Sequence, residues 1–385
     1  MNGNPIVTKI ELIEFAWVAE NIGLSPFGHQ PTYLPGATWR RTRTIMRMHT
    51  DDGIVGEVSP VPSLPGSWRG ILGESALDRE RIYNRLKLAG SEGLGAVDNC
   101  LWDIAGKVLG LPAFRLLGGD RARLPTHIST MNGALDGPLS TPESFADYAE
   151  EALGMGYGGF KIHPWPGGSI RSHTALVAAV GDRVGGRMDL MMDPFCSYPT
   201  FADALKVGWA CDDYRYLWLE DPYADNGVSH FGHRKLRELI KTPLLQGEKA
   251  KGLEERVNLI IAGATDLVRG DPIEWGLTST MKLAHAAEGL GLDIEMHGVG
   301  PVCRQAMAAC RNSNYYELSW VHPDLPAPHP PIFAEYDDTI WAVSKDDGCV
   351  PTPLLPGLGV RYDWDWINAH LESRRVVADI ADGVH

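Results

Sequence analysis

The sequence predicts an α/β protein in which a small α+β domain precedes a parallel barrel. Strand patterns give way to helix patterns within residues 1–122, and eight short apolar runs then alternate with helix-length segments over residues 123–322. Eight strand–helix units in roughly 200 residues are typical of a barrel rather than of an open sheet. No glycine-rich phosphate-binding motif follows any of these runs, which argues against a dinucleotide-binding fold.

The first part of the chain contains the expected strands of the α+β domain. Residues 5–17 largely alternate apolar and polar side chains, which predicts a half-buried strand. Residues 40–60 are typical of a hairpin with an Asp-Asp-Gly turn, and its alternating basic residues are expected on one solvated sheet face. Residues 18–38 and 60–70 carry no period, so both are expected to be loops, and the longer one is of the kind that often forms a lid.

Helical patterns follow, and a further segment closes the chain. Apolar residues recur at helical spacing over residues 74–89 and 95–116. After a proline-rich passage, the C-terminal segment 323–385 is expected to form a strand at 340–343 and a helix at 365–380. We expect this segment to return to the first domain.

The barrel strands are predicted from short apolar runs that helix-length segments separate. Helices are expected at residues 199–211, 230–240 and 277–290, among others. The eight predicted strands span residues 125–132, 158–163, 188–193, 216–220, 243–248, 266–271, 293–297 and 315–320.

Three acidic residues end successive runs of this barrel. Asp193, Glu220 and Glu248 each follow an apolar stretch, at steps of 27 and 28 residues. Such a step covers one strand, one helix and two loops, so the three carboxylates are expected to point into one mouth of the barrel. Solvated strand-end acids are the alternative, and the matching register disfavours it. Three converging hard oxygen ligands suit Mg²⁺ better than zinc, so the sequence predicts a magnesium site.

The remaining strand ends also carry ionisable residues. Asp271 and His297 end neighbouring strands, and an Asp that accepts a hydrogen bond from one imidazole nitrogen makes the other nitrogen more basic. This pair is therefore a candidate general base. Lys161 and His163 lie two residues apart on one side of their strand, where one could neutralise substrate charge and the other exchange a proton. Glu317 is a candidate protonated acid that donates to a substrate carboxylate; a structural role stays open for it and for His163.

Charge and composition exclude several other functions. The formal net charge is −14, which argues against nucleic acid or an anionic membrane surface as a partner. No apolar run is long enough to span a bilayer, and no signal-peptide pattern opens the chain. The six cysteines form no regular pairs, so we expect reduced thiols and a cytoplasmic protein.

The residues at the strand ends resemble those of the enolase superfamily. Within it, the resemblance is to the mandelate racemase/muconate lactonizing enzyme family, and there to the mandelate racemase subgroup. The resemblance rests on residues 96–119, on Glu220 within Trp-Leu-Glu-Asp-Pro, on Glu248 within Gly-Glu, and on His297 within Met-His-Gly. It implies a TIM-like (β/α)7β barrel with an α+β capping domain, in which loops 18–38 and 60–70 close on the substrate. It also implies the roles of metal ligands for the acidic trio, of a catalytic dyad for Asp271 and His297, and of an electrophilic acid for Glu317.

One departure bears on the reaction. The subgroup often has Lys-x-Lys on the second barrel strand, where this chain has Lys161-Ile-His163. By resemblance, sequences altered here are mostly acid-sugar dehydratases, in which the dyad histidine can be the main catalyst. The expected reaction is Mg²⁺-dependent removal of the α-proton of a 2-hydroxy carboxylate, by His163 or His297, followed by loss of water to give a 2-keto-3-deoxy acid.

Two alternatives stay open. One is a racemase or epimerase of a 2-hydroxy acid that uses His163 and His297 on opposite faces, and the other is a non-catalytic descendant that binds metal and ligand. The partner is a small acid sugar or 2-hydroxy acid, and resemblance suggests a homo-oligomer, either a dimer or an octamer. Candidate substrate-binding residues in and near the loops are His29, Gln30, Tyr33, Trp68, Arg69 and Trp165.

Overall fold

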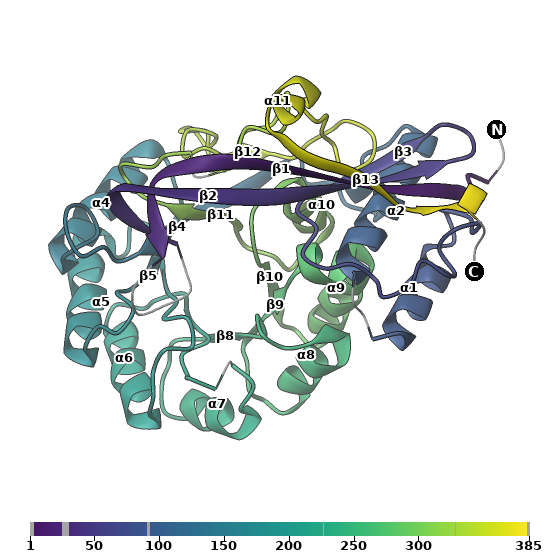
Figure 1. The fold of residues 1–385 in the computed structure, drawn as a ribbon. Coiled ribbons are helices and arrows are strands. Elements are labelled where there is room, and N and C mark those ends of the chain that lie inside the picture. The colour runs from purple at the N-terminus through teal and green to yellow at the C-terminus, as the bar shows by residue number, and fades with distance from the viewer. Residues whose placement is uncertain (1–3, 25–30, 91–92, 226, 328, 383–385) are drawn as a thin grey trace.

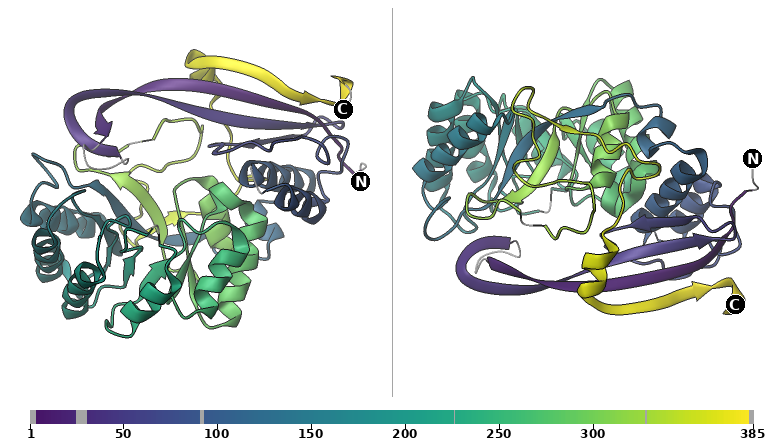
Figure 2. Two further views of the ribbon diagram at one scale, coloured as in Figure 1. Left: turned by 60° about the horizontal axis from the view of Figure 1, so that its bottom comes forward. Right: turned by 90° about the horizontal axis from the view of Figure 1, so that it is seen from above.

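The fold consists of a ring of parallel strands and helices with a second, mainly antiparallel layer beside it (Figure 1). The computed structural model describes residues 4–24, 31–90, 93–225, 227–327 and 329–382. Figure 2 shows the second layer as a long hairpin lying beside the ring in both views.

Seven strands of the ring pair in parallel and in chain order, and the eighth, β11, pairs in parallel with the first, β4. The predicted strands are confirmed, with ends that shift by a few residues. Most of their side chains are buried on both faces, which explains why they are near-continuous apolar runs. The strands are β4 (Arg123–Asn132), β5 (Gly159–His163), β6 (Asp189–Met192), β7 (Trp218–Glu220), β8 (Leu244–Gln246), β9 (Leu267–Gly270), β10 (Asp293–Met296) and β11 (Tyr316–Val321).

A helix follows each of the first seven of these strands, and the helices surround the strands (Figure 1). Thr141, Ser169, Thr200 and Ser229 cap four of them by accepting a backbone hydrogen bond in the first turn. Among the residues described, no helix has both the length and the apolar character needed to cross a membrane. The helices are α4 (Pro142–Met155), α5 (Ile170–Val184), α6 (Phe201–Asp213), α7 (His230–Arg237), α8 (Gly252–Ile261), α9 (Pro272–Gly289) and α10 (Pro301–Ala309).

The second layer is a hairpin of two long antiparallel strands, β1 (Val7–Leu24) and β2 (Pro31–Thr50). The expectation of a loop over residues 18–38 is wrong for the described part, because β1 and β2 stay paired as far as Leu24 and Pro31. Ala19 and Ile22 are buried in a cluster with Met131 of β4, so the barrel stabilises this strand extension. A local periodicity cannot reveal such a partner.

The remaining N-terminal elements agree with expectation. Strand β3 (Val55–Val58) pairs with β2 across the predicted Asp-Asp-Gly turn. The predicted helices are present as α1 (Arg79–Leu88), α2 (Leu94–Leu109) and the short α3 (Ala113–Leu116). Helix α2 packs against α9, and it joins the two layers.

The C-terminal segment returns to the second layer, but not in the expected form. Helix α11 (Trp364–Ala369) is short, and β13 (Leu371–Asp379) follows it and pairs antiparallel with β1. The prediction of a helix over residues 365–380 is therefore wrong beyond its first turns, because the edge of β1 offers backbone partners to this segment. Residues 340–343 form a turn rather than a strand, and β12 (Cys349–Pro351) pairs with β4 instead. The domain boundaries at residues 122 and 322 stay a prediction.

Candidate active site

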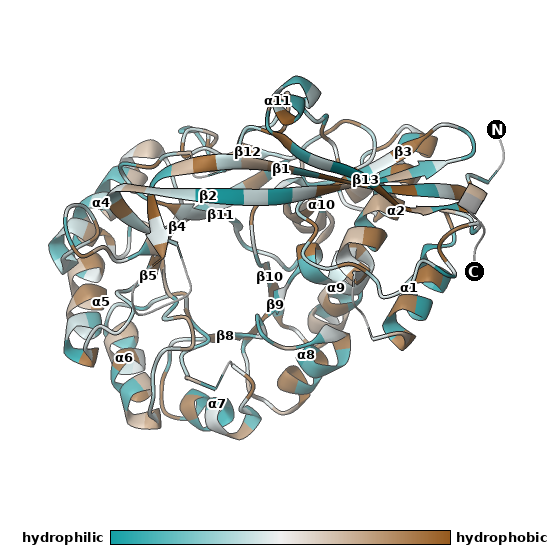
Figure 3. Ribbon diagram, in the orientation of Figure 1, coloured by the Kyte–Doolittle hydropathy of each residue, from teal (hydrophilic) through white to brown (hydrophobic). Residues whose placement is uncertain are grey.

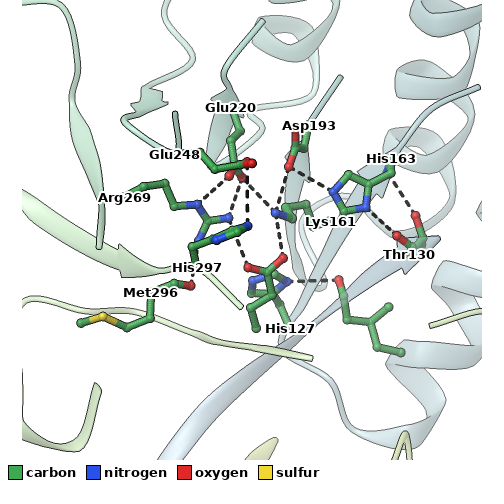
Figure 4. A network of polar contacts seen from close by, with 12 residues as sticks. His127, Thr130, Lys161, His163, Asp193, Glu220, Glu248, Arg269, Met296 and His297 are labelled. Atoms are coloured by element: carbon green, nitrogen blue, oxygen red, sulfur yellow. Dashed lines mark hydrogen bonds and ion pairs between the residues drawn. The ribbon is translucent and has the colours of Figure 1, made fainter. Parts of the chain in front are cut away.

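The acidic trio converges at the carboxyl ends of three neighbouring strands (Figure 4). Asp193 directly follows β6, Glu220 ends β7, and Glu248 lies two residues after β8. One carboxylate oxygen of each lies within 4.8 Å of the others. Asp193 and Glu220 are buried and Glu248 is half-buried, so the three acids offer oxygen ligands at one partly enclosed point.

Lys161 lies in the middle of the acidic residues. Its Nζ is 3.0 Å from Oδ2 of Asp193, 3.0 Å from Oε2 of Glu220 and 2.9 Å from Oε1 of Glu317. Burial opposes the charged form, but the charges of Glu220 and Glu317 outweigh it and raise the pKa of Lys161. The side chain is therefore a fixed ammonium group, suited to stabilise negative charge and not to accept a proton.

Arg269, in the middle of β9, is a site residue that the sequence reasoning missed. It is fully buried; its Nε lies 2.5 Å and its Nη2 2.7 Å from the two carboxylate oxygens of Glu220. Nη1 donates to the carbonyl of Met296 at 2.9 Å. The only available signal was one arginine inside an otherwise apolar strand, Leu-Val-Arg-Gly.

Glu317 on β11 lies between two cations. Lys161 lies 2.9 Å from one of its oxygens, and Arg269 lies 3.4 Å from the other. Burial favours the neutral acid, but these two cations outweigh it and hold the pKa of Glu317 well below its ordinary value. These contacts favour the ionised form over the expected protonated donor, and the role of Glu317 stays a prediction.

His297 and Asp271 form the expected pair. Nδ1 of His297 lies 2.9 Å from Oδ2 of Asp271, whose other oxygen accepts from the backbone N–H of Glu274 as the cap of α9. Nε2 is thereby left to face Glu248, at 3.9 Å. Burial lowers the pKa of the imidazole, but the charges of Glu248 and Asp271 outweigh it and raise the pKa of His297 to about 9.

His163 is held from both sides. Its Nδ1 lies 2.5 Å from the carbonyl of Thr130, and its Nε2 lies 3.0 Å from Oδ2 of Asp193 (Figure 4). Both ring nitrogens are thus engaged by neighbouring oxygen atoms. The ring also stacks on Phe195 and Trp320, with centroids 4.3 and 5.2 Å away. The Nε2 atom of His163 is therefore directed at Asp193, a predicted metal ligand, and not at open space in the site.

Several of these groups line a cavity of about 500 Å³ between the two layers. Its lining includes Lys161, His163, Asp193, Glu248, His297 and Glu317 from the barrel, and Arg41 and Arg43 from β2. The expectation that the hairpin arginines share one solvated face is therefore wrong, because the second side of β2 faces this cavity.

The four described candidate substrate residues have contacts outside the cavity lining. Tyr33 stacks on His322 with ring centroids 3.9 Å apart, and Trp165 donates its indole N–H to Leu139. Trp68 packs against the core and Arg69 is exposed. None of Tyr33, Trp68, Arg69 and Trp165 is among the described residues that line the cavity. His29 and Gln30 lie outside the described residues, so all six substrate assignments stay predictions.

The donor set fits a divalent cation. Asp193, Glu220 and Glu248 present only oxygen atoms, which suits Mg²⁺ and gives zinc none of the nitrogen or sulfur ligands that it prefers. Glu220 is already balanced by Arg269, and one oxygen of Glu248 is paired with Lys249. Glu248 still carries a second oxygen towards the cavity, where it meets His297 at 3.9 Å.

Comparisons with known proteins show what the chain is similar to. The D-xylonate dehydratase of Haloferax volcanii is 27% identical, with 87% of each chain covered. The D-gluconate dehydratase of Thermoproteus tenax is 26% identical over 69% of this chain and 58% of its own length. A crystal structure of D-glucarate dehydratase from Agrobacterium tumefaciens complexed with magnesium is 27% identical, with a TM-score of 0.86 over 96% of this chain and 100% of that chain. Residues 144–366, more than half of the chain, match the model of the enolase C-terminal domain-like family, and the chain therefore belongs to that family.

Proposed function

We propose that this protein dehydrates an acid sugar, an aldonate or an aldarate, to a 2-keto-3-deoxy acid, with Mg²⁺ as its cofactor. The observation that carries the proposal is that His297 lines one cavity together with Asp193 and Glu248 of the carboxylate trio, and its Nε2 lies 3.9 Å from Glu248. A candidate base close to candidate metal ligands supports the removal of an α-proton from a carboxylate.

His297 carries the proton through the reaction. In its neutral form its Nε2 accepts the α-proton, while Asp271 holds the hydrogen on Nδ1 and stabilises the imidazolium that results. The bond between C3 and its hydroxyl oxygen then breaks, and the imidazolium proton joins the departing hydroxide to form water. The enol left behind gains a proton at C3 and loses the proton of its C2 hydroxyl, and so becomes the 2-keto-3-deoxy acid.

The other groups stabilise charge. Lys161 is a fixed ammonium group that can bind the carboxylate oxygens of the enediolate. Lys161 and Arg269 lie against the two oxygens of Glu317, so we assign Glu317 to the positioning of these cations. Asp193, Glu220 and Glu248 would hold the Mg²⁺. When bound, Mg²⁺ supplies positive charge that stabilises the enediolate and offsets the charge of Glu248, which otherwise keeps His297 protonated.

A racemase or epimerase is the second candidate, because His163 and His297 both line the cavity, from β5 and from just beyond β10. The contacts of His163 disfavour it. Both ring nitrogens of His163 are engaged, by Thr130 and by Asp193, so the ring has no free nitrogen to accept a proton from the second face of a substrate.

We also propose that the second layer serves as a cap over the barrel. This is supported by Arg41 and Arg43 of β2, which line the cavity together with residues at the strand ends. The pairing of β13 with β1 adds the C-terminal segment to that layer. The cap would close the site from water and select the substrate.

A screen of mono- and diacid sugars with Mg²⁺ tests this proposal. Formation of a 2-keto-3-deoxy acid from at least one of them, abolished by a chelator and restored by Mg²⁺, is the expected result. The same incubations in D₂O separate the two candidates. Deuterium at C2 of the recovered acid, without any keto product, would support the racemase; neither product nor exchange across the library would contradict both.

A further inference from the structure

Two arginines of the hairpin face the cavity. Arg41 and Arg43 lie two residues apart on β2, so their side chains leave the same face of the strand. Both line the cavity that also holds Lys161 and His297. Figure 3 shows the middle of β2 as hydrophilic, although it lies beside the barrel.

Aromatic rings hold the two guanidinium groups. The central carbon of the Arg41 guanidinium lies 4.9 Å from the ring centre of Trp39 and 5.5 Å from that of Trp17. That of Arg43 lies 5.5 Å from Trp17. Stacking of this kind restricts the planar group and leaves its N–H edge free to bind a planar anion.

Neither arginine has an acidic partner within the part of the chain that the structure describes. The neighbouring Arg40, on the opposite face, pairs with Glu372 at 2.6 Å, and Arg47 pairs with Glu57 at 2.9 Å. Arg43 is half-buried, and its burial together with the charge of Arg41 lowers its pKa to about 10. Two partly desolvated positive charges without a counter-ion are unfavourable unless a ligand supplies one.

A third polar group faces the same end of the cavity. His329 lines the cavity, and its Nε2 is buried without a hydrogen-bond partner among the described residues. Burial and the charges of the two arginines lower the pKa of His329 to about 3, so the ring is neutral. The acids in this wall do not compensate the arginines: Asp338 pairs with Arg304 at 2.5 Å, and Asp337 is exposed.

We infer that Arg41 and Arg43, assisted by His329, bind a second carboxylate at the far end of the substrate, so that the preferred substrates are diacid sugars. The inference rests on the proposed dehydration and specifies its substrate class. Two guanidinium groups match the oxygens of a carboxylate, and a cavity of about 500 Å³ accommodates a short chain with an acid at each end. The first carboxylate binds near Lys161 and the second between the arginines.

The test compares matched substrates. Each five- or six-carbon aldarate is paired with the aldonate that differs only in having a hydroxymethyl group at the far end, and with that aldonate phosphorylated there. Initial rates of keto-acid formation give kcat/KM, and calorimetry with the His297→Asn protein gives affinity without turnover. The variants are Arg43→Met, Arg41→Met and the charge-conserving Arg43→Lys, with Arg40→Met as the matched control on the outer face.

Loss of one charged hydrogen-bonding group costs about tenfold to a hundredfold in binding. We therefore expect Arg43→Met and Arg41→Met to raise KM and weaken affinity for the aldarates by this factor, with little change for the aldonates. Arg43→Lys should recover part of the loss, and Arg40→Met should behave as the wild type. The melting temperature of ligand-free Arg43→Met should equal or exceed that of the wild type, because an uncompensated charge is removed.

Equal use and equal affinity for aldonates and aldarates would overturn the inference and leave the dehydration standing. An equal effect of Arg43→Met on aldonates and aldarates would also overturn the inference. A preference for the phosphorylated compounds would overturn the assignment of a carboxylate as the bound group. If no compound is dehydrated, the proposed function fails, and the calorimetric comparison of diacids with monoacids still decides the inference.

Discussion

Nδ1 of His297 lies 2.9 Å from Oδ2 of Asp271, and the second oxygen of Asp271 caps α9 by accepting from the backbone of Glu274. The base is thus tied to the start of a helix, which fixes both the ring orientation and the position of its hydrogen. Because Asp271 follows β9 and His297 follows β10, the relationship depends on two neighbouring parallel strands.

Replacement of Asp271 by Asn should lower kcat for dehydration by about 10²–10⁴-fold, because the imidazolium loses its stabilising charge and its fixed tautomer. Asp271→Asn combined with His297→Asn should be little worse than the worse single variant, since the two residues act as a unit. Steady-state kinetics of the three proteins provide the check. Multiplicative losses would show that the residues act independently.

Removal of Mg²⁺ should lower the melting temperature of the wild-type protein, because a ligand that binds only the folded state stabilises it. At a free Mg²⁺ concentration of 100 times the Kd, the gain is about 2.7 kcal/mol. Glu248→Gln should weaken Mg²⁺ binding at least about tenfold while the fold persists, since Glu248 is only half-buried. Calorimetric titration measures this, with the exposed Glu238→Gln as control. Unchanged affinity in Glu248→Gln would remove that residue from the metal site.

Replacement of Arg269 by Met should destabilise the protein strongly. Its guanidinium is the bidentate partner of the buried Glu220, and loss of one partner of a buried ion pair costs about 3–5 kcal/mol. Urea denaturation should show this loss, whereas Arg311→Met, at an exposed ion pair with Glu288, should change the free energy of unfolding by less than about 1 kcal/mol. A small effect at Arg269 would mean that Glu220 is satisfied without it.

Stability should fall as the pH rises from about 4.5 to about 7 because of Glu295. This acid accepts hydrogen bonds from Asn314, but its burial dominates and raises its pKa from 4.5 to about 7. A carboxyl group whose pKa is higher in the folded state stabilises the protein when protonated, so its contribution is complete below about pH 4.5. This contribution to the free energy of unfolding amounts to about 3 kcal/mol, and it is lost by about pH 7.

Glu295→Gln isolates this effect from other titrating groups. The free energy of unfolding of the wild type, relative to that of Glu295→Gln, should be about 3 kcal/mol lower at pH 8 than at pH 5. Urea midpoints at the two pH values measure it. A pH-independent difference would show that Glu295 is ionised in the folded protein at both values.

Patterns that repeat along the chain were predictable from the sequence. Asp193, Glu220 and Glu248 each end an apolar strand at nearly equal spacing, and parallel strands bring such ends together whatever the side chains around them. The proximity of Asp271 and His297 was predictable from the same rule, because they follow two neighbouring parallel strands. Local rules sufficed here because neighbouring units of the barrel are also neighbours in the chain.

Features that depend on distant partners were not predictable in this way. The extension of β1 depends on packing against Met131, and residues 371–379 form a strand because β1 presents a free edge. Arg269 lies in an apolar strand, and its role became evident only from its contacts with Glu220. For Arg41 and Arg43, alternation in the sequence shows that one face is basic, but not that this face looks into a cavity.

The central claim is that His297 removes the α-proton of an acid sugar. The most direct measurement is the rate of 2-keto-3-deoxy acid formation by His297→Asn, with Mg²⁺ saturating and with the exposed His285→Asn as matched control on α9. We predict a loss of at least about 10²-fold in kcat for His297→Asn and unchanged kcat for His285→Asn. Turnover by His297→Asn at the wild-type rate would contradict the claim.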